Sequence, residues 1–121
     1  MTTKQLPKRQ IQFSTLELYG NRKIFENALN EGFSNVAFGS SGSWINGRKL
    51  VALFAFSNGK GDVLTYEHYI AGSNGIDHKD RSSEQRKLSA KEFDGFVGDQ
   101  LLHLDNTMNL RELLDSWEKE N

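Results

Sequence analysis

Residues 44–75 read WINGRKLVALFAFSNGKGDVLTYEHYIAGSNG, and this stretch decides the fold. It contains three Asn-Gly dipeptides, at Asn46-Gly47, Asn58-Gly59 and Asn74-Gly75, each beside an apolar or aromatic run. Asn-Gly between two such runs is the strongest short-range signal for a β-hairpin, because both residues tolerate the positive φ angles of a tight turn. The middle of the chain is therefore predicted to be an antiparallel β-meander.

The strand over residues 50–56 is predicted to lie at the centre of this meander. Alternation places Leu50, Ala52, Phe54 and Phe56 on one face and Val51, Leu53 and Ala55 on the other. Both faces are apolar and need cover, which favours a central position. Residues 33–38 and 62–71 are predicted to be its neighbours, and residues 73–83 a polar loop. Residues 86–88 add a short edge strand, whose lysine and arginine discourage edge-to-edge association.

Helical spacing flanks the meander on its N-terminal side. Ile24, Phe25, Ala28 and Leu29 form an apolar stripe that ends at Gly32. Asn21 can cap this helix, although Ser14 and Glu17 have capping-box spacing and allow an earlier start. Residues 9–13 alternate between apolar and polar side chains and are predicted to form a further strand.

Two amphipathic helices are predicted after the meander. The first follows a capping-box pattern at Ser89 and Glu92, and its apolar stripe runs to Leu104. The second follows Asn109, with an apolar stripe of Leu110, Leu113, Leu114 and Trp117. The fold class is predicted to be α+β: an antiparallel β-meander sheet with one N-terminal helix and two C-terminal helices packed on it, as a single globular domain over residues 1–121.

Composition excludes several classes of function. The chain has no cysteine, so it forms no disulfide framework, thiolate nucleophile or cysteine-ligated zinc site, and we expect it to be cytoplasmic. The longest apolar run, residues 50–56, is too short to span a bilayer. Three histidines lack the tight spacing of a metal site, so neither a metal nor another cofactor is expected. The basic residues are too few and too balanced by acids to favour nucleic-acid binding.

The favoured function is that of a small protein-binding module. The charged side chains of the last thirty residues are predominantly acidic, which points to a cationic protein partner. Tryptophan is enriched at the energetic centres of interfaces. The predicted partner-binding residues are Trp44, Asp99, Glu112, Asp115 and Glu118. A stoichiometric inhibitor, such as an immunity protein that neutralises a cationic toxin, fits this size and composition. An apolar sheet face left uncovered would also allow a homodimer.

Two alternatives come from other classes of function. The first is a small histidine-dependent hydrolase or nuclease, which would use His78 or His68 with Asp77, Tyr66 or Arg81 as acid-base and stabilising groups. The second is an anion or nucleotide sensor. In that case the flexible Gly39–Ser43 turn, Gly-Ser-Ser-Gly-Ser, would offer backbone amides and hydroxyls to a phosphate. We weigh the chain as a binding protein ahead of an enzyme.

Overall fold

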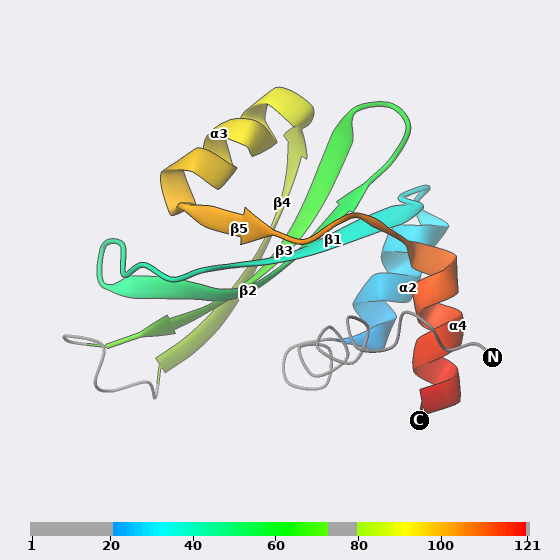
Figure 1. The fold of residues 1–121 in the computed structure, drawn as a ribbon, viewed down its shortest axis with the longest axis horizontal. Coiled ribbons are helices and arrows are strands. Elements are labelled where there is room, and N and C mark those ends of the chain that lie inside the picture. The colour runs from blue at the N-terminus through cyan, green and yellow to red at the C-terminus, as the bar shows by residue number, and fades with distance from the viewer. Residues whose placement is uncertain (1–20, 73–79, 121) are drawn as a thin grey trace.

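The computed structural model describes residues 21–72 and 80–120. Within them the chain forms an α+β fold, an antiparallel sheet with helices on both faces (Figure 1). In chain order the elements are α2 (Arg22–Asn30), β1 (Asn35–Ser41), β2 (Arg48–Ser57), β3 (Asp62–Ala71), β4 (Asp80–Ser89), α3 (Ala90–Gln100), β5 (Leu102–Leu104), β6 (Met108–Asn109) and α4 (Leu110–Glu120). The predicted fold class is confirmed. The strand predicted at residues 9–13 lies outside the described residues.

The strands form one sheet in the order β4-β3-β2-β1-β5, and each described pairing is antiparallel. The short strand β6 pairs with β1 further along the same edge as β5. The strand β2 lies at the centre of the sheet, as its two apolar faces predicted.

Two of the three Asn-Gly turns fall within the described residues, and both are confirmed. Asn46 and Gly47 join β1 to β2 with φ angles of 54° and 83°, the left-handed values that a two-residue hairpin turn requires. The Asn58 side chain accepts hydrogen bonds from two backbone amides in the turn between β2 and β3, at 2.9 and 3.1 Å. The third dipeptide, Asn74-Gly75, lies outside the described residues.

A β-bulge in β2 changes the predicted distribution of its side chains. The register shifts between Leu50 and Ala52, and one extra residue moves the preceding side chain to the opposite face. Leu50 therefore lies with Leu53 and Ala55, and only the side chains from Ala52 onward, such as Phe54, keep their predicted faces. The prediction that Leu50 shares a face with Phe54 was wrong.

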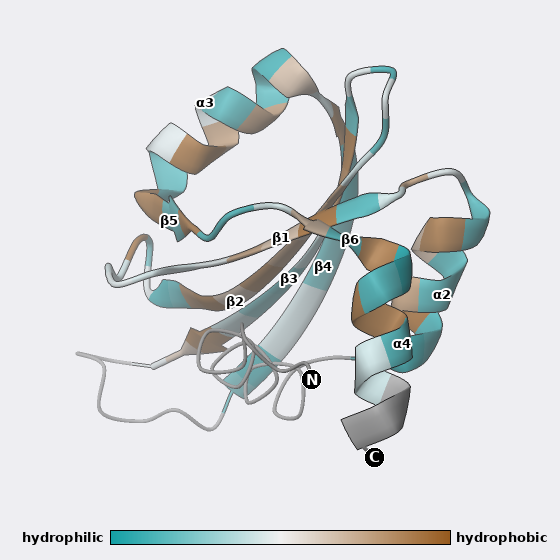
Figure 2. Ribbon diagram, turned by 45° about the vertical axis from the view of Figure 1, so that its right-hand side comes forward, coloured by the Kyte–Doolittle hydropathy of each residue, from teal (hydrophilic) through white to brown (hydrophobic). Residues whose placement is uncertain are grey.

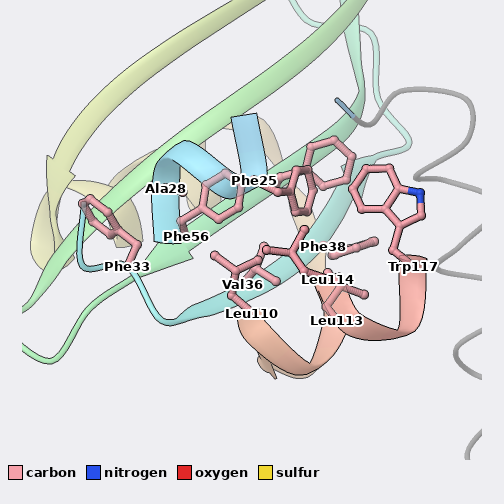
Figure 3. Close-up of a cluster of buried hydrophobic side chains, with 11 residues drawn as sticks. Phe25, Ala28, Phe33, Val36, Phe38, Phe56, Leu110, Leu113, Leu114 and Trp117 are labelled. Atoms are coloured by element: carbon pink, nitrogen blue, oxygen red, sulfur yellow. The ribbon is translucent and has the colours of Figure 1, made fainter. Parts of the chain in front are cut away.

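The two faces of the sheet carry separate cores. The larger core packs α2 and α4 onto β1 and β2 (Figure 3), and its buried residues are Phe25, Ala28, Phe33, Val36, Phe38, Phe54, Phe56, Leu110, Leu113, Leu114 and Trp117. The smaller core lies under α3, and its buried residues are Leu50, Leu53, Ala55, Val63 and Tyr69. Residues Phe93 and Phe96 of α3 cover this second core while remaining partly exposed.

The helix caps follow the sequence patterns. The Asn21 side chain accepts a hydrogen bond from the amide of Lys23 at 2.9 Å and begins α2, while Ser14 lies outside the described residues. Ser89 and Glu92 form the predicted capping box. The Asn109 side chain accepts a bond from the third residue of α4 at 3.0 Å. At the predicted start of each described helix, a side chain therefore accepts a hydrogen bond from a backbone amide of the first turn.

The helix predicted after Ser89 is shorter than its apolar stripe indicated. The helix α3 ends at Gln100, Leu101 adopts a left-handed conformation with φ 54°, and residues 102–104 form β5. Pairing with β1 explains this difference, because Leu102 lies opposite Ser41 and Leu104 lies opposite Gly39. The prediction that residues 101–104 are helical was therefore wrong.

The Gly39–Ser43 segment is not the flexible turn that was predicted. Gly39 to Ser41 belong to β1, and Gly39 is paired with both β2 and β5. A side chain at Gly39 would place its Cβ 2.6 Å from Leu104 Cδ2 and 2.9 Å from the carbonyl oxygen of His103. The glycine therefore allows β5 to approach β1, and only Gly42 and Ser43 of the segment lie outside the strand.

The strand β4 extends well beyond the predicted residues 86–88. It covers residues 80–89 and pairs with β3 in an unbroken register from Asp80 opposite Ala71 to Ser89 opposite Asp62. Residues 80–83 are therefore strand and not loop. Their polar composition is typical of a loop, but backbone pairing with β3 stabilises them as a strand.

Candidate functional site

A buried carboxylate lies on the α3 face of β3. The Glu67 side chain is fully buried and accepts hydrogen bonds from the hydroxyls of Thr65 at 2.7 Å and Tyr69 at 2.5 Å. The guanidinium of Arg86, on β4, donates from Nε at 2.6 Å and from one terminal nitrogen at 3.0 Å. Four donors thus converge on two carboxylate oxygens.

Two further side chains, Glu84 and Arg48, surround this cluster. The Arg86 guanidinium also donates to Glu84 at 2.7 Å, and Arg48 donates to the other oxygen of Glu84 at 2.8 Å. The Arg48 guanidinium lies 3.7 Å from the centroid of the Tyr69 ring. The hydrogen bond from Arg48 holds the pKa of Glu84 below its ordinary value, whereas hydrogen bonding to Glu67 raises the pKa of Arg86. Arg48 and Arg86 thereby link β2, β3 and β4.

This cluster stabilises the fold and does not form a catalytic site. A carboxylate offers about four lone-pair sites, and two hydroxyls and two guanidinium nitrogens occupy them on Glu67. No lone pair remains to accept a proton from a substrate. Sequence alternation placed Thr65, Glu67 and Tyr69 on one face of a strand, which was the available signal for this cluster, but it did not identify Arg86 as their partner.

Alkaline titration should detect this cluster. Burial raises the pKa of the Tyr69 phenol above its ordinary value of 10.0, and the hydrogen bond to Glu67 raises it further. A raised pKa gives stability that is complete below the unfolded value and is lost as the pH rises through the folded one. We expect one of the three tyrosines to ionise only as the protein unfolds. Phenolate absorbance measures this ionisation. Tyr69→Phe should remove that delayed step, and its persistence in the variant would contradict the assignment.

The residues of the predicted hydrolase site are only partly brought together. The rings of Tyr66 and His68 lie 5.0 Å apart in an edge-to-face contact, on the face of β3 opposite Glu67. Arg81 is exposed and pairs with Ile70 on the neighbouring strand. Asp77 and His78 lie outside the described residues.

The predicted acidic face is divided between two sides of the sheet. Asp99 is exposed on α3, whereas Glu112 and Asp115 are exposed on α4, which packs on the opposite face (Figure 1). Glu118 also belongs to α4, but its side chain is not described. These acids therefore cannot contact one flat partner surface together. The sequence showed their charge but not this division.

Asp115 instead lines a groove of about 300 Å³ between α2 and α4. Arg22 and Arg111 also line the groove, so it carries basic as well as acidic side chains. Arg22 is bound to Glu26 at 2.9 Å and to the carbonyl of Leu114 at 3.3 Å. The mixed charges around the groove weaken the case for α4 as a docking site for a cationic partner.

The end of α3 and the strand after it form the most exposed apolar site among the described residues. Leu101 and Leu104 are 58% and 39% exposed, and they are the large hydrophobic residues that the described chain leaves exposed. Asp99 and Asp105 are exposed on either side of them in the sequence. We call these four residues the α3–β5 surface. Figure 2 shows this hydrophobic junction on the far side of the molecule from α2 and α4.

Trp44 lies at the same end of the sheet as this surface. Because Leu102 pairs with Ser41, the start of β5 lies beside the end of β1, where the hairpin containing Trp44 begins (Figure 1). Trp44 is half-buried, with the Lys49 ammonium 5.9 Å from its ring centroid. The fold thus gathers two predicted partner-binding residues, Trp44 and Asp99, at one end of the sheet.

No protein-family model, curated protein or solved structure matches the chain. Within residues 21–72 and 80–120, no helix has the length and apolar character needed to cross a membrane. In the same residues, no group of three His, Asp or Glu side chains is arranged to hold a metal ion.

Proposed function

We propose that the chain is a small cytoplasmic binding protein, of the type of a stoichiometric inhibitor, that docks a cationic protein partner on the α3–β5 surface. Exposed apolar side chains beside polar groups are typical of a docking site. The carboxylates of Asp99 and Asp105, which flank the two leucines in the sequence, would steer a basic partner into place. Trp44 lies at the same end of the sheet and would extend the contact.

The observation that carries this proposal is the state of Leu101. Its backbone has φ 54°, a conformation that costs an L-residue about 1–2 kcal/mol. Its side chain is 58% exposed, so little burial offsets that cost. Glycine is the common residue at such a helix end. A large apolar side chain that is both strained and exposed is explained by a contact outside the chain.

Leu101→Gly should therefore weaken binding while stabilising the fold. Removal of the side chain takes away the apolar anchor, and glycine relieves the backbone strain by about 1 kcal/mol. We expect partner affinity to fall by at least about tenfold, as for a residue at an interface centre. Affinity purification from the native host identifies the partner, and calorimetric titration and thermal unfolding of the purified proteins then measure both quantities.

A charge exchange provides the matched control. Asp99→Lys with Asp105→Lys should slow association by at least about tenfold at physiological ionic strength, where the Debye length is about 8 Å. Glu112→Lys with Asp115→Lys makes the same change in net charge on α4 and should leave association within about twofold, because α4 lies on the opposite face of the sheet. Loss of binding in the α4 variant alone would move the docking site to α4 and refute the α3–β5 assignment.

A further inference from the structure

The strand β4 is a long and regular edge. It extends over ten residues, Asp80–Ser89, and its register with β3 contains no bulge. It contains no proline. On its other side it pairs with no residue in the described part of the chain. Edge strands are usually kept short, bulged or interrupted by proline, because unpaired backbone groups invite another strand.

The outward-facing backbone groups of β4 can be identified from one hydrogen bond. The Ala90 amide donates to the Gly61 carbonyl at 2.9 Å, one step beyond the pair formed by Asp62 and Ser89. Because inward and outward groups alternate along an antiparallel strand, even-numbered residues of β4 face β3 and odd-numbered residues face outward. The amides and carbonyls of residues 83, 85 and 87 are thus directed away from β3.

We propose that two copies of the chain pair through β4, antiparallel, about a twofold axis at Gln85. In this register Glu84 of each copy lies opposite Arg86 of the second copy, which gives two attractive pairs. A centre at Glu84 would oppose two carboxylates and would also place Arg81 against Lys87. A centre at Arg86 would oppose two guanidiniums. Among these centres, only Gln85 gives opposite charges along the edge.

A centre at Ser83 avoids opposing two like charges at the axis, but it shortens the contact, as does any centre nearer an end of the strand. It would oppose Asp80 and Arg86, but within the described strand it pairs only residues 80–86, whereas the Gln85 register pairs residues 81–89. Lysine and arginine alone would repel a second copy, as the sequence indicated. Glu84 reverses that effect, and its side chain, 38% exposed, is accessible to a second guanidinium. The occupant favoured by this charge pattern is therefore a second copy of the chain.

Single cysteines test the register, because the chain has none of its own. In the proposed dimer the two Gln85 residues lie opposite each other with Cα atoms about 5.5 Å apart, within the range of a disulfide. The two Ser83 residues are offset by four positions, about 13 Å along the strand. Gln85 and Ser83 are both exposed on the same face of β4, so their cysteine variants are well matched.

Under mild oxidation, Gln85→Cys should form a covalent dimer at least about tenfold faster than Ser83→Cys, because only the first pair lies within the Cα separation that a disulfide spans. Light scattering on the unmodified chain should give twice the mass of one 13.7 kDa chain at high concentration and a single-chain mass on dilution. A single-chain mass at every concentration would overturn the proposal, and so would equal cross-linking of the two variants. After either result, a strand from another protein would be the candidate partner for the free edge of β4.

Discussion

Glu67→Ala is expected to destabilise the fold by about 3–5 kcal/mol, the usual cost of breaking a buried ion pair from one side. The carboxylate is fully buried and holds Thr65, Tyr69 and Arg86 through four hydrogen bonds. Without it, two hydroxyls lose their acceptor and the Arg86 guanidinium loses its buried partner. The free energy of unfolding, measured in a urea titration, gives the result.

Glu26→Ala is the control for this prediction. Glu26 pairs with Arg22 at 2.9 Å on the surface of α2, and its side chain is 49% exposed. An exposed pair four residues apart on a helix contributes only about 0.3–0.5 kcal/mol. The same chemical change should therefore cost far less there. If the two variants lost similar amounts of stability, Glu67 would not be the centre that links β3 to β4.

Local chemistry predicted the parts of the fold that depend on neighbouring residues. The turn at Asn46-Gly47 needs only two residues with positive φ, and both are present in the sequence. The helix after Asn109 needs a cap and an apolar stripe, and both are adjacent in the chain. Such elements can be predicted from the sequence because the interactions that stabilise them span only a few positions.

The elements that sequence reasoning missed depend on distant partners. The strand β5 exists because residues 102–104 pair with residues 39–41, more than sixty positions earlier. The strand β4 is polar along most of its length, so its ladder to β3 determines its structure more than its composition does. The bulge after Leu50 likewise reflects pairing with β3. None of these contacts leaves a periodic pattern in the local sequence.

The candidate docking site shows the same division. Asp99 and Trp44 were identified from charge and residue type. Leu101 and Leu104 were instead assigned to a buried helical stripe, because their spacing from Phe93 and Val97 fits a helix. The left-handed backbone at Leu101 ends that helix and exposes both leucines. A positive φ at a leucine has no signature in the sequence, so the exposed pair was visible only in the structure.

Phe25→Ala is the second change with a large expected effect, a loss of about 3–5 kcal/mol. Phe25 is fully buried, and its ring centroid lies 5.0 Å from those of Phe54 and Phe56 and 5.3 Å from that of Trp117 (Figure 3). It therefore joins α2, the sheet and α4 at one point. Truncation leaves a cavity among aromatic rings that cannot close around it without losing their edge-to-face contacts.

The matched control is Phe93→Ala on α3, where the ring is partly exposed and covers the smaller core. Its truncation should cost about 1–2 kcal/mol, because less apolar area leaves water on folding. Urea unfolding measures both variants. In a Trp44→Phe background, Trp117 is the remaining tryptophan, and its emission should shift to the red in Phe25→Ala alone. Since small domains are stable by about 5–15 kcal/mol, Phe25→Ala removes a large share of that stability. A loss equal to that of Phe93→Ala would mean that the two cores contribute alike, and that α2 and α4 do not depend on this ring.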